Sequence, residues 1–303
     1  MSVQNSSPAR RSAPAPAAQT AGGQAPGAQT AATPASTVPN LLGPSFDMTA
    51  PPPAPAPPPE PAVRLEHVSK RFGRGALVLD DVSLDILPGE FVCLLGASGC
   101  GKSTLLNLIA GLDAPTGGGI TTPPEGAAFM FQDSALMPWL TARRNVELAL
   151  RLRGVPRRER GEQALALLDT VNLADAADKR PHELSGGMRQ RVALARALAQ
   201  DRPVLLMDEP FAALDAITRD LLHEELEHVW RATGRAIVFV THNVREAVRL
   251  GQRVVLLSSR PGRIAREWRV QKTVGRRIES PEVGALATEI TGHLRTEIRR
   301  NAA

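Results

Sequence analysis

The chain has 303 residues and a formal net charge of +5, and aromatic residues make up only 3% of it, with no Tyr. A basic chain can bind nucleic acid, but the scarcity of side chains on which bases stack argues against such a partner. Two cysteines are too few for a disulfide framework or a cysteine metal cluster, and no run approaches the roughly 18 apolar residues of a membrane span.

Residues 1–62 form a stretch rich in Pro, Ala, Gln, Ser, Thr and Gly, with few bulky side chains. Such a segment cannot bury enough apolar surface to offset its chain entropy, so we predict a disordered tail with a polyproline spacer from Pro51 to Pro61. No apolar core of signal-peptide length follows Arg10 and Arg11, which argues against export, although the composition allows an organelle transit peptide as the alternative. With only two cysteines and no disulfide framework, we expect the chain to reside in the reducing cytoplasm.

Apolar runs predict the strands of the remaining chain. The first two runs alternate apolar and polar residues, as half-exposed antiparallel strands do, whereas the runs that begin at Val204 and Ala236 are continuously apolar, as strands covered on both faces are. Helical segments between the runs indicate a layered α/β core. The predicted strands are Val63 to Val68, Leu77 to Ile86, Phe91 to Leu95, Ala127 to Phe131, Val204 to Met207, Ala236 to Val240 and Arg253 to Leu257.

Two regions are predicted to be helical without strands. Between Leu140 and Pro181 the strand pattern disappears, which indicates a helical insert over about 135–183. Within the C-terminal extension 271–303, the stretch from Pro281 to Arg300 has apolar residues near helical spacing and predicts an amphipathic helix. The helical period of the insert is given by Leu148, Leu152, Leu165, Leu168 and Val171. Its arginines fit solvated faces or contact with anionic lipid head groups.

A glycine-rich stretch follows the strand that ends at Leu95 and opens a helix-like run from Thr104 to Gly111. Its pattern, G-x-x-x-x-G-K-S, is that of a phosphate-binding P-loop, in which glycines let several N–H groups face one anion. We expect Lys102 to reach the β- and γ-phosphates of ATP and Ser103 to hold Mg²⁺. The residues expected to contact the nucleotide here are Gly96, Ala97, Ser98, Gly99, Cys100, Gly101, Lys102, Ser103 and Thr104. The Cys100 thiol is either reactive in this electropositive loop or a tolerated small residue.

Acidic and polar residues end the other buried strands. Asp208 and Glu209 follow an apolar run, at the strand end where α/β sheets place ligands. We expect Asp208 to orient Mg²⁺ and Glu209 to accept a proton from the attacking water. His242 ends the next strand and is expected to position that water, while Gln132, beyond an earlier strand, is expected to reach Mg²⁺ or the water. The alternatives are an acidic turn for the pair and a structural role for His242.

A second open helix start occurs at Leu184-Ser185-Gly186-Gly187. Ser185 is a suitable N-cap, and the glycines leave the helix start accessible to an anion. Because the P-loop of this chain already binds the phosphates, we expect Ser185, Gly186 and Gly187 to face the ATP of another copy.

These motifs together resemble the nucleotide-binding subunit of ATP-binding cassette (ABC) transporters, over about Val63 to Gly262. The resemblance implies a P-loop NTPase domain over 63–270 with a mixed sheet core, an antiparallel β subdomain and a helical subdomain. It implies a head-to-tail dimer that sandwiches two ATP molecules, each between the P-loop of one chain and Ser185 and Gly187 of the other. It also implies two membrane permease subunits, a periplasmic or lipid-anchored substrate-binding protein, and a peripheral location on the cytoplasmic face of the inner membrane.

The same resemblance assigns two further positions. The segment Ala213-Leu214-Asp215 resembles the loop that joins the two sites across the dimer, so Asp215 is expected near the nucleotide. Phe72 stands where the family usually has a Tyr that stacks on adenine, and packing in the core is the alternative for its ring.

Three longer segments resemble importers for nitrate, aliphatic sulfonates and taurine. They are Gln132 to Thr141, Asp208 to Arg219 and Ser258 to Arg263. The expected function is that of the ATP-hydrolysing subunit of an importer for a small oxyanion, an aliphatic sulfonate or taurine. The alternatives are import of nitrate or nitrite (or bicarbonate or cyanate), an ABC ATPase without a transport role, and a binding module with an inactive site. Met188, Asn243 and Arg245 depart from the family pattern, which bears on rate and on permease contact.

Overall fold

The computed structural model describes residues 59–212, 214–270 and 280–302. For residues 301 and 302 it describes the backbone alone. The predicted disordered tail therefore lies outside the described residues except at 59–62, and so does Ala213. The described residues all belong to one compact unit, which spans Ala56–Ala303.

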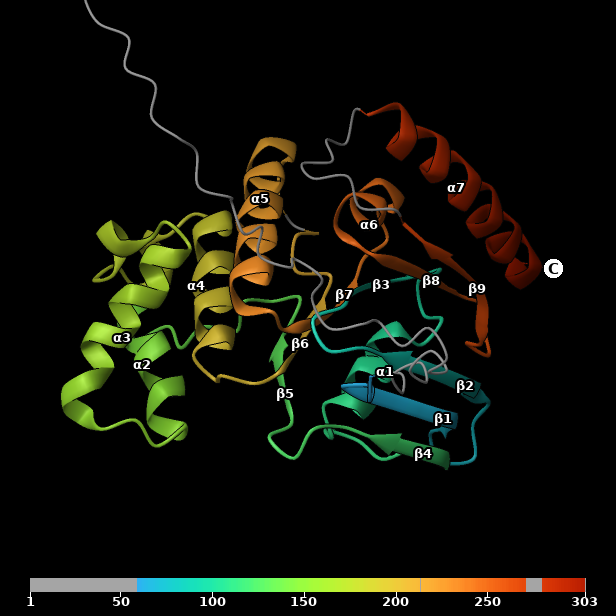
Figure 1. The fold of residues 1–303 in the computed structure, drawn as a ribbon, viewed down its shortest axis with the longest axis horizontal. Coiled ribbons are helices and arrows are strands. Elements are labelled where there is room, and N and C mark those ends of the chain that lie inside the picture. The colour runs from blue at the N-terminus through green and yellow to red at the C-terminus, as the bar shows by residue number, and fades with distance from the viewer. Residues whose placement is uncertain (1–58, 213, 271–279, 303) are drawn as a thin grey trace, which may run out of the picture. The chain divides into compact units, whose positions relative to one another are not determined.

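A six-stranded mixed sheet forms the centre of the domain, in the order β5-β6-β7-β3-β8-β9 (Figure 1). The first five strands in that order run parallel, and β9 joins the edge antiparallel to β8. The strands are β3 (Phe91–Leu95), β5 (Ala127–Met130), β6 (Val204–Asp208), β7 (Ala236–Val240), β8 (Arg253–Leu257) and β9 (Ile264–Arg269). The buried runs of β6 and β7 confirm the prediction of strands covered on both faces.

A separate three-stranded antiparallel sheet has the order β2-β1-β4, with β1 at Val63–Arg71, β2 at Leu77–Ile86 and β4 at Gly117–Thr121. Its alternating burial confirms the half-exposed antiparallel pair predicted for β1 and β2. Neither β4 nor β9 was predicted. Glycines begin β4, and charged residues interrupt β9, so both strands depend on their neighbours for pairing rather than on an apolar pattern.

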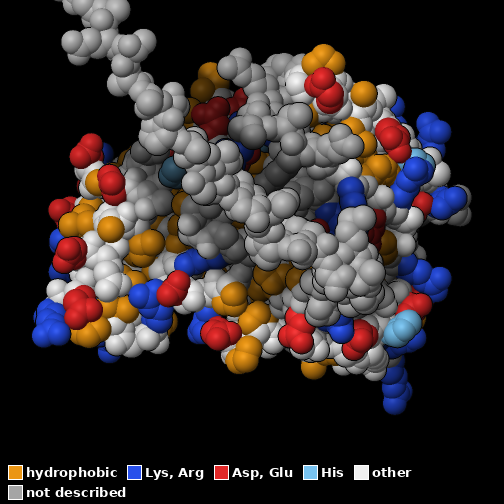
Figure 2. Space-filling view, viewed as in Figure 1, with side chains coloured by type: hydrophobic (Ala, Val, Ile, Leu, Met, Phe, Trp, Pro, Cys, Tyr) orange, Lys and Arg blue, Asp and Glu red, His pale blue; other side chains and the backbone are white. Residues whose placement is uncertain are grey.

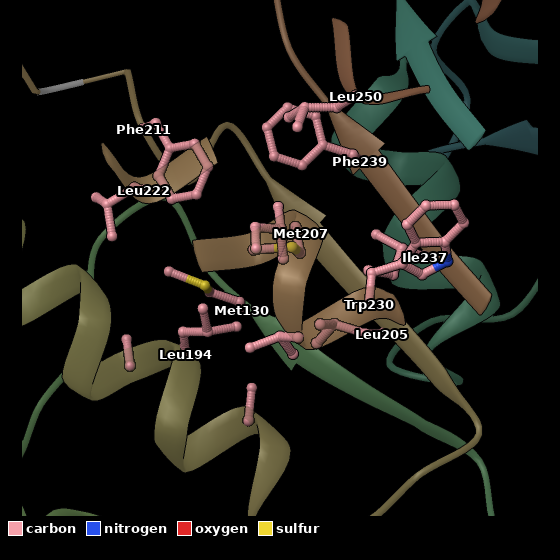
Figure 3. Close-up of a cluster of buried hydrophobic side chains, with 14 of the residues drawn as sticks. Met130, Leu194, Leu205, Met207, Phe211, Leu222, Trp230, Ile237, Phe239 and Leu250 are labelled. Atoms are coloured by element: carbon pink, nitrogen blue, oxygen red, sulfur yellow. The ribbon is translucent and has the colours of Figure 1, made fainter. Parts of the chain in front are cut away.

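The helices pack against both faces of the central sheet. One core lies between the central sheet, the antiparallel sheet and α1 (Lys102–Ile109), whose Leu105 and Leu106 are fully buried. The other core lies beneath α4 (Gly186–Leu198), α5 (Ala216–Thr233), α6 (Val244–Leu250) and α7 (Pro281–Ala302). In Figure 3 the side chains of Met207, Phe211 and Phe239 fill the space on this second face.

The insert is helical, as predicted, with α2 at Ala142–Leu152, α3 at Arg157–Thr170 and short 3₁₀ turns at Ala174–Ala176 and Pro181–Glu183. Of the residues that showed the helical period, Leu168 and Val171 are buried, whereas Leu152 is 82% exposed and Leu165 is also exposed. The buried residues of α2 are Ala142, Asn145, Val146, Ala149 and Leu150.

Basic side chains mark the outer part of this insert. Figure 2 shows them gathered at the left edge, where Figure 1 places α2 and α3. The exposed arginines here are Arg144, Arg151, Arg153, Arg157 and Arg158.

The predicted C-terminal amphipathic helix is confirmed as α7. Val283, Ala287 and Ile290 are buried on its inner face. The Trp268 indole of β9 donates to Glu289 at 2.9 Å, which ties α7 to the edge of the sheet. No helix of the described residues is both long and apolar enough to span a bilayer.

Candidate nucleotide site

The motif residues meet because their strands are parallel. The P-loop follows β3, Gln132 follows β5, Asp208 and Glu209 end and follow β6, and His242 follows β7. Val240 of β7 is paired with Leu94 on one side and with Asp208 on the other, so these chain ends lie at one edge of the sheet. Parallel strands place ligands at this edge, since successive carboxyl ends converge there.

The P-loop is shaped by its glycines. Gly101 has a φ of 106° and is the N-cap of α1 without a capping side chain, so the backbone N–H groups at the helix start stay open. A Cβ at Gly101 would lie 2.7 Å from Leu79 Cδ2, so glycine is required for both conformation and space.

Lys102 is held by the P-loop itself. Its Nζ donates to the carbonyl oxygens of Gly96 and Ala97 at 3.0 Å each, and the side chain is buried. The ammonium group is therefore fixed inside the curl of the loop, at the start of a helix whose dipole also favours an anion. The sequence placed Lys102 correctly in the motif but gave no sign of these two acceptors.

The carboxylate of Asp208 faces the Ser103 hydroxyl. Burial raises the pKa of Asp208, the nearby charge of Glu209 acts in the same direction, and the hydrogen bond from Ser103 and the charge of Lys102 lower it. A partly desolvated carboxylate beside a hydroxyl is a donor set of hard oxygen atoms that suits Mg²⁺. Among the described residues, no group of three or more His, Cys, Asp or Glu is arranged to hold a metal ion.

Glu209 and His242 are brought together across neighbouring strands. Glu209 Oε2 lies 3.0 Å from Nδ1 of His242, whose side chain is 64% exposed. Glu209 has a φ of 44°, in the left-handed region, and its N–H donates to the Val240 carbonyl at 3.0 Å. The unusual backbone turns the carboxylate away from the course of β6 and toward the next strand.

Gln132 is exposed, and the loop behind it is anchored to α4. Gln190 Nε2 donates to the Gln132 carbonyl at 3.0 Å, and Arg196 donates to the carbonyls of Ser134 and Ala135 at 2.8 and 2.7 Å. Gln190 and Arg196 were not singled out from the sequence, because no local pattern relates α4 to a loop more than fifty residues away.

The second open helix start does not meet the P-loop within one chain. Ser185 caps α4 by accepting from the Met188 N–H at 3.2 Å, and within the described chain no hydrogen bond or ion pair joins Ser185 or Gly187 to residues 96–104. A Cβ at Gly187 would lie 2.4 Å from Thr218 Cγ2, so α4 and α5 approach closely there. Thr218 in turn donates its N–H to Asp215 Oδ1 at 3.0 Å, which makes Asp215 the N-cap of α5.

The exposure of Phe72 and the burial of Cys100 bear on the alternatives left open for these two residues. Phe72 is 53% exposed, which contradicts the alternative of core packing, and Lys70 Nζ lies 4.9 Å from the ring centroid on one side. Cys100 is buried, and desolvation raises the pKa of its thiol, which favours the unreactive alternative.

Arg260, a residue the sequence did not single out for the site, touches the P-loop. Its Nε donates to the Gly99 carbonyl at 3.2 Å. Its loop packs closely on the same segment, because a Cβ at Gly262 would lie 2.2 Å from the Cys100 carbonyl oxygen. The C-terminal part of the domain thus braces the outer side of the phosphate loop.

The departures from the family pattern are structurally accommodated. The Asn243 side chain accepts from the N–H groups of Arg245 and Glu246 at 3.0 and 3.3 Å and so caps α6, as an acidic residue would. Met188 is partly buried against the core beneath α4.

Comparison with known proteins agrees with this geometry. The sequence pattern of the ABC transporter family matches residues 79–212. The chain is 51% identical over 202 residues to the nitrate import ATP-binding protein NrtD of a Synechocystis species, which covers 64% of this chain and 76% of the relative. It is 48% identical over 216 residues to the taurine import ATP-binding protein TauB of Mesorhizobium japonicum, which covers 69% of this chain and 84% of the relative.

A solved structure has the same fold. The dimeric structure of a post-hydrolysis state of the ATP-binding cassette MJ0796, bound to ADP and Pi, matches with a TM-score of 0.61 and 36% identity, covering 70% of this chain and 100% of that one. The chain therefore belongs to the ATP-binding subunits of ABC transporters, in the group that includes the nitrate and taurine import proteins.

Proposed function

We propose that this chain binds and hydrolyses ATP to energise the import of a small oxyanion, an aliphatic sulfonate or taurine. The observation that supports hydrolysis most directly is the 3.0 Å contact between Glu209 and His242, at the same sheet edge as the P-loop. A carboxylate oriented by an imidazole can accept the proton of a water that attacks the γ-phosphate.

The neighbouring groups have complementary roles in this proposal. Lys102 and the backbone N–H groups of the P-loop bind the phosphates, and Phe72 offers an exposed ring face to adenine. Ser103, Asp208 and Gln132 would hold Mg²⁺, which would neutralise phosphate charge when bound. His242 orients the water together with Glu209.

We propose that two copies assemble head to tail around two ATP molecules. The support is the open start of α4, where Ser185, Gly186 and Gly187 have no contact with the P-loop among the described residues of their own chain, and Asp215 at the exposed start of α5. ATP would then favour the closed dimer by binding it more tightly than the open form. Hydrolysis would remove γ-phosphate contacts and reopen it.

A groove beside the Gln132 loop suits a membrane subunit. It has a volume of 500 Å³ and lies between β5, the Gln132 loop and α2. Phe131 and Leu152 on its wall are exposed, whereas Arg153, Arg196 and Arg202 supply polar contacts. We propose that a cytoplasmic helix of a permease subunit docks here, because Gln190 and Arg196 connect this loop to α4, the helix whose start would face the partner's ATP.

The remaining assignments follow from this assembly. Two permease subunits and a periplasmic or lipid-anchored binding protein would complete the importer, and the chain would sit on the cytoplasmic face of the inner membrane. The domain division proposed is a tail over 1–62, the ATPase domain over 63–270 with its insert at about 135–183, and an extension over 271–303.

A growth experiment tests the solute. A strain lacking this gene, complemented with the wild-type chain or with Lys102→Ala, is grown with taurine, an alkanesulfonate or sulfate as the sole sulfur source. We expect loss of growth on one of the organosulfur compounds only, restored by the wild-type chain alone. Loss on nitrate as sole nitrogen source, with normal growth on every sulfur source, would instead establish the nitrate alternative, which the 51% identity to NrtD keeps open.

A further inference from the structure

A set of buried polar side chains lies beneath the loop that carries His242. It consists of His223 on α5, Thr241, and Glu246 and Arg249 on α6, and all of them are buried. None has a role in the nucleotide chemistry proposed above. Burying polar groups costs free energy unless they are hydrogen-bonded, so the partners of these side chains indicate what the cluster holds in place.

The hydrogen bonds of His223 define its tautomer, that is, which ring nitrogen carries the proton. Its Nδ1 lies 3.0 Å from Arg249 Nη1, and because a guanidinium can only donate, Nδ1 accepts and carries no proton. Nε2 therefore carries the proton and donates to Glu246 Oε1 at 2.5 Å. The ring of Phe211 packs edge-on against the imidazole, with centroids 5.6 Å apart, and limits its rotation.

Glu246 passes this restraint to the loop. Its Oε2 accepts a hydrogen bond from the Thr241 hydroxyl, and that hydroxyl oxygen in turn accepts from the Asn243 N–H at 3.0 Å. The Thr241 N–H donates to the Leu94 carbonyl at 3.2 Å. Both chain neighbours of His242 are thus held in place, while its own side chain is left to contact Glu209.

We infer that His223 and Glu246 are positioning residues for ATP hydrolysis, which act through Thr241 to fix the loop that presents His242 to Glu209 and to the γ-phosphate. The inference rests on the proposed function. Phe211 lies two residues after Glu209 in the chain, so the same imidazole braces the segments on both sides of the Glu209–His242 contact. The same helix, α5, begins at Asp215 and meets Gly187 through Thr218, so it spans from the partner-facing elements to the hydrolytic loop.

The first test uses a matched pair at Thr241. Thr241→Val keeps the shape but removes the hydroxyl, which leaves Glu246 Oε2 and the Asn243 N–H without this partner, whereas Thr241→Ser keeps the hydroxyl. We expect Thr241→Val to lower kcat by about 10- to 100-fold, the scale of a small misplacement of a reacting group, with an unchanged KM for ATP. Thr241→Ser should recover most of kcat. Equal kcat for the two variants would overturn the inference.

The second test separates the two ring nitrogens of His223. A Gln amide can reproduce the donor at Nε2 toward Glu246, and an Asn amide can reproduce only the group nearer the backbone, at Nδ1. We expect His223→Gln to retain kcat and His223→Asn to lose it, with similar ATP affinity in both. Because Asn also fills less volume than Gln, a role confined to packing predicts the same order, and the Thr241 pair separates the two roles. An equal loss of kcat in both His223 variants would contradict the inference. If either protein fails to fold, the Thr241 pair decides.

A double-mutant cycle shows whether the effect passes through His242. In a His242→Ala background, Thr241→Val should cause no further loss of the residual single-turnover rate, because there is no imidazole left to position. The full loss in that background would refute the proposed route. The proposed function has a separate criterion: a wild-type chain that binds ATP without Mg²⁺-dependent hydrolysis would reject it, whereas an active wild type with an active Thr241→Val rejects the inference alone.

Discussion

Asp208 and Glu209 are adjacent in the chain but have different surroundings. Asp208 ends β6 and faces Ser103, which lies in the first turn of α1. Glu209 leaves the strand with a left-handed backbone and contacts His242 instead. One carboxylate is thereby suited to a metal ion and the other to a water molecule, because side chains on either side of a strand end face different neighbours.

Glu209→Gln tests the assignment of the general base. Loss of a general base typically lowers the rate by about 10²–10⁴, or roughly 3–5.5 kcal/mol in activation free energy. ATP binding should remain, and the ATP-bound dimer should persist longer because γ-phosphate is not removed. Turnover and ATP affinity are measured side by side with Glu282→Gln, an exposed change on α7. Unaltered turnover in Glu209→Gln would mean that another group accepts the proton.

Asp208→Asn is expected to raise the melting temperature of the nucleotide-free protein at pH 7. Burial raises the pKa of Asp208 in the folded state, so its contribution to stability is complete below the unfolded pKa and declines as pH rises through the folded pKa. The difference in melting temperature between Asp208→Asn and the wild type should therefore shrink as pH falls toward about 3.9, the ordinary Asp pKa. Thermal unfolding at several pH values measures it. With Mg²⁺-ATP the order should reverse, because the wild type keeps its proposed metal ligand and gains more stability from the bound nucleotide than the variant does.

At the scale of elements, the contact between α4 and α5 depends on the absence of one side chain. Gly187→Ala would place a methyl group 2.4 Å from Thr218 Cγ2, whereas the nearest atom to a Cβ at Gly186 is 3.7 Å away. Overpacking of this kind costs about 1–3 kcal/mol. We expect Gly187→Ala to lower the free energy of unfolding and Gly186→Ala to leave it nearly unchanged.

Thr218→Ser supplies the control for this contact. Serine lacks the Cγ2 methyl but keeps the backbone N–H that donates to Asp215. In denaturant titrations, Gly187→Ala combined with Thr218→Ser should recover the stability lost by Gly187→Ala alone. No recovery would indicate that the glycine is required for another reason.

The open start of α4 gives a prediction about assembly. Ser185→Arg should spare ATP binding by the monomer yet abolish ATP-driven dimerisation, since a long cation would occupy the surface proposed to meet the partner's phosphates. Loss of the N-cap by itself costs about 1 kcal/mol, so Ser185→Asn, which can cap the helix, is the matched control. Sedimentation with and without ATP distinguishes them. Dimers of the arginine variant in the presence of ATP would refute the role in trans.

Elements with a strong local signal could be predicted from sequence, and those without one could not. The apolar runs of β6 and β7 bury both strand faces, and this alone marks them. In contrast, β4 consists largely of glycine, and its strand conformation comes from pairing with β1. The helical period of the insert does not reveal which leucines are buried: Leu152 lies on the wall of a groove, where a large apolar residue gives the same periodic signal as a core position.

On the scale of the whole molecule, both hydrophobic cores are formed by described residues from Val63 onward. We therefore expect deletion of residues 1–59 to leave ATPase activity and the unfolding temperature nearly unchanged. A colorimetric phosphate assay and thermal unfolding of the truncated and full chains check this. A large loss of turnover would show that the tail contributes to the nucleotide site.

The sequence identifies candidate residues for the site, but it does not show the contacts that join them to distant segments. A P-loop and strand-end acids are recognised locally, because each motif needs only a strand end or a helix start. The contact of Arg260 with Gly99 and the network of His223 and Glu246 join distant segments, so they follow only from the order of the strands in the sheet. Strand order is a property of the folded domain and has no counterpart in any short stretch of sequence.

The left-handed backbone at Glu209 has a consequence for laboratory evolution. Glycine or asparagine adopts a φ of 44° more readily than glutamate does. Selection for heat tolerance alone, with no demand for solute uptake, should therefore enrich Gly or Asn at position 209. Such variants would be more stable to heat but would lack ATPase activity. This result would show that Glu209 is retained for turnover although its side chain disfavours the left-handed backbone at this position.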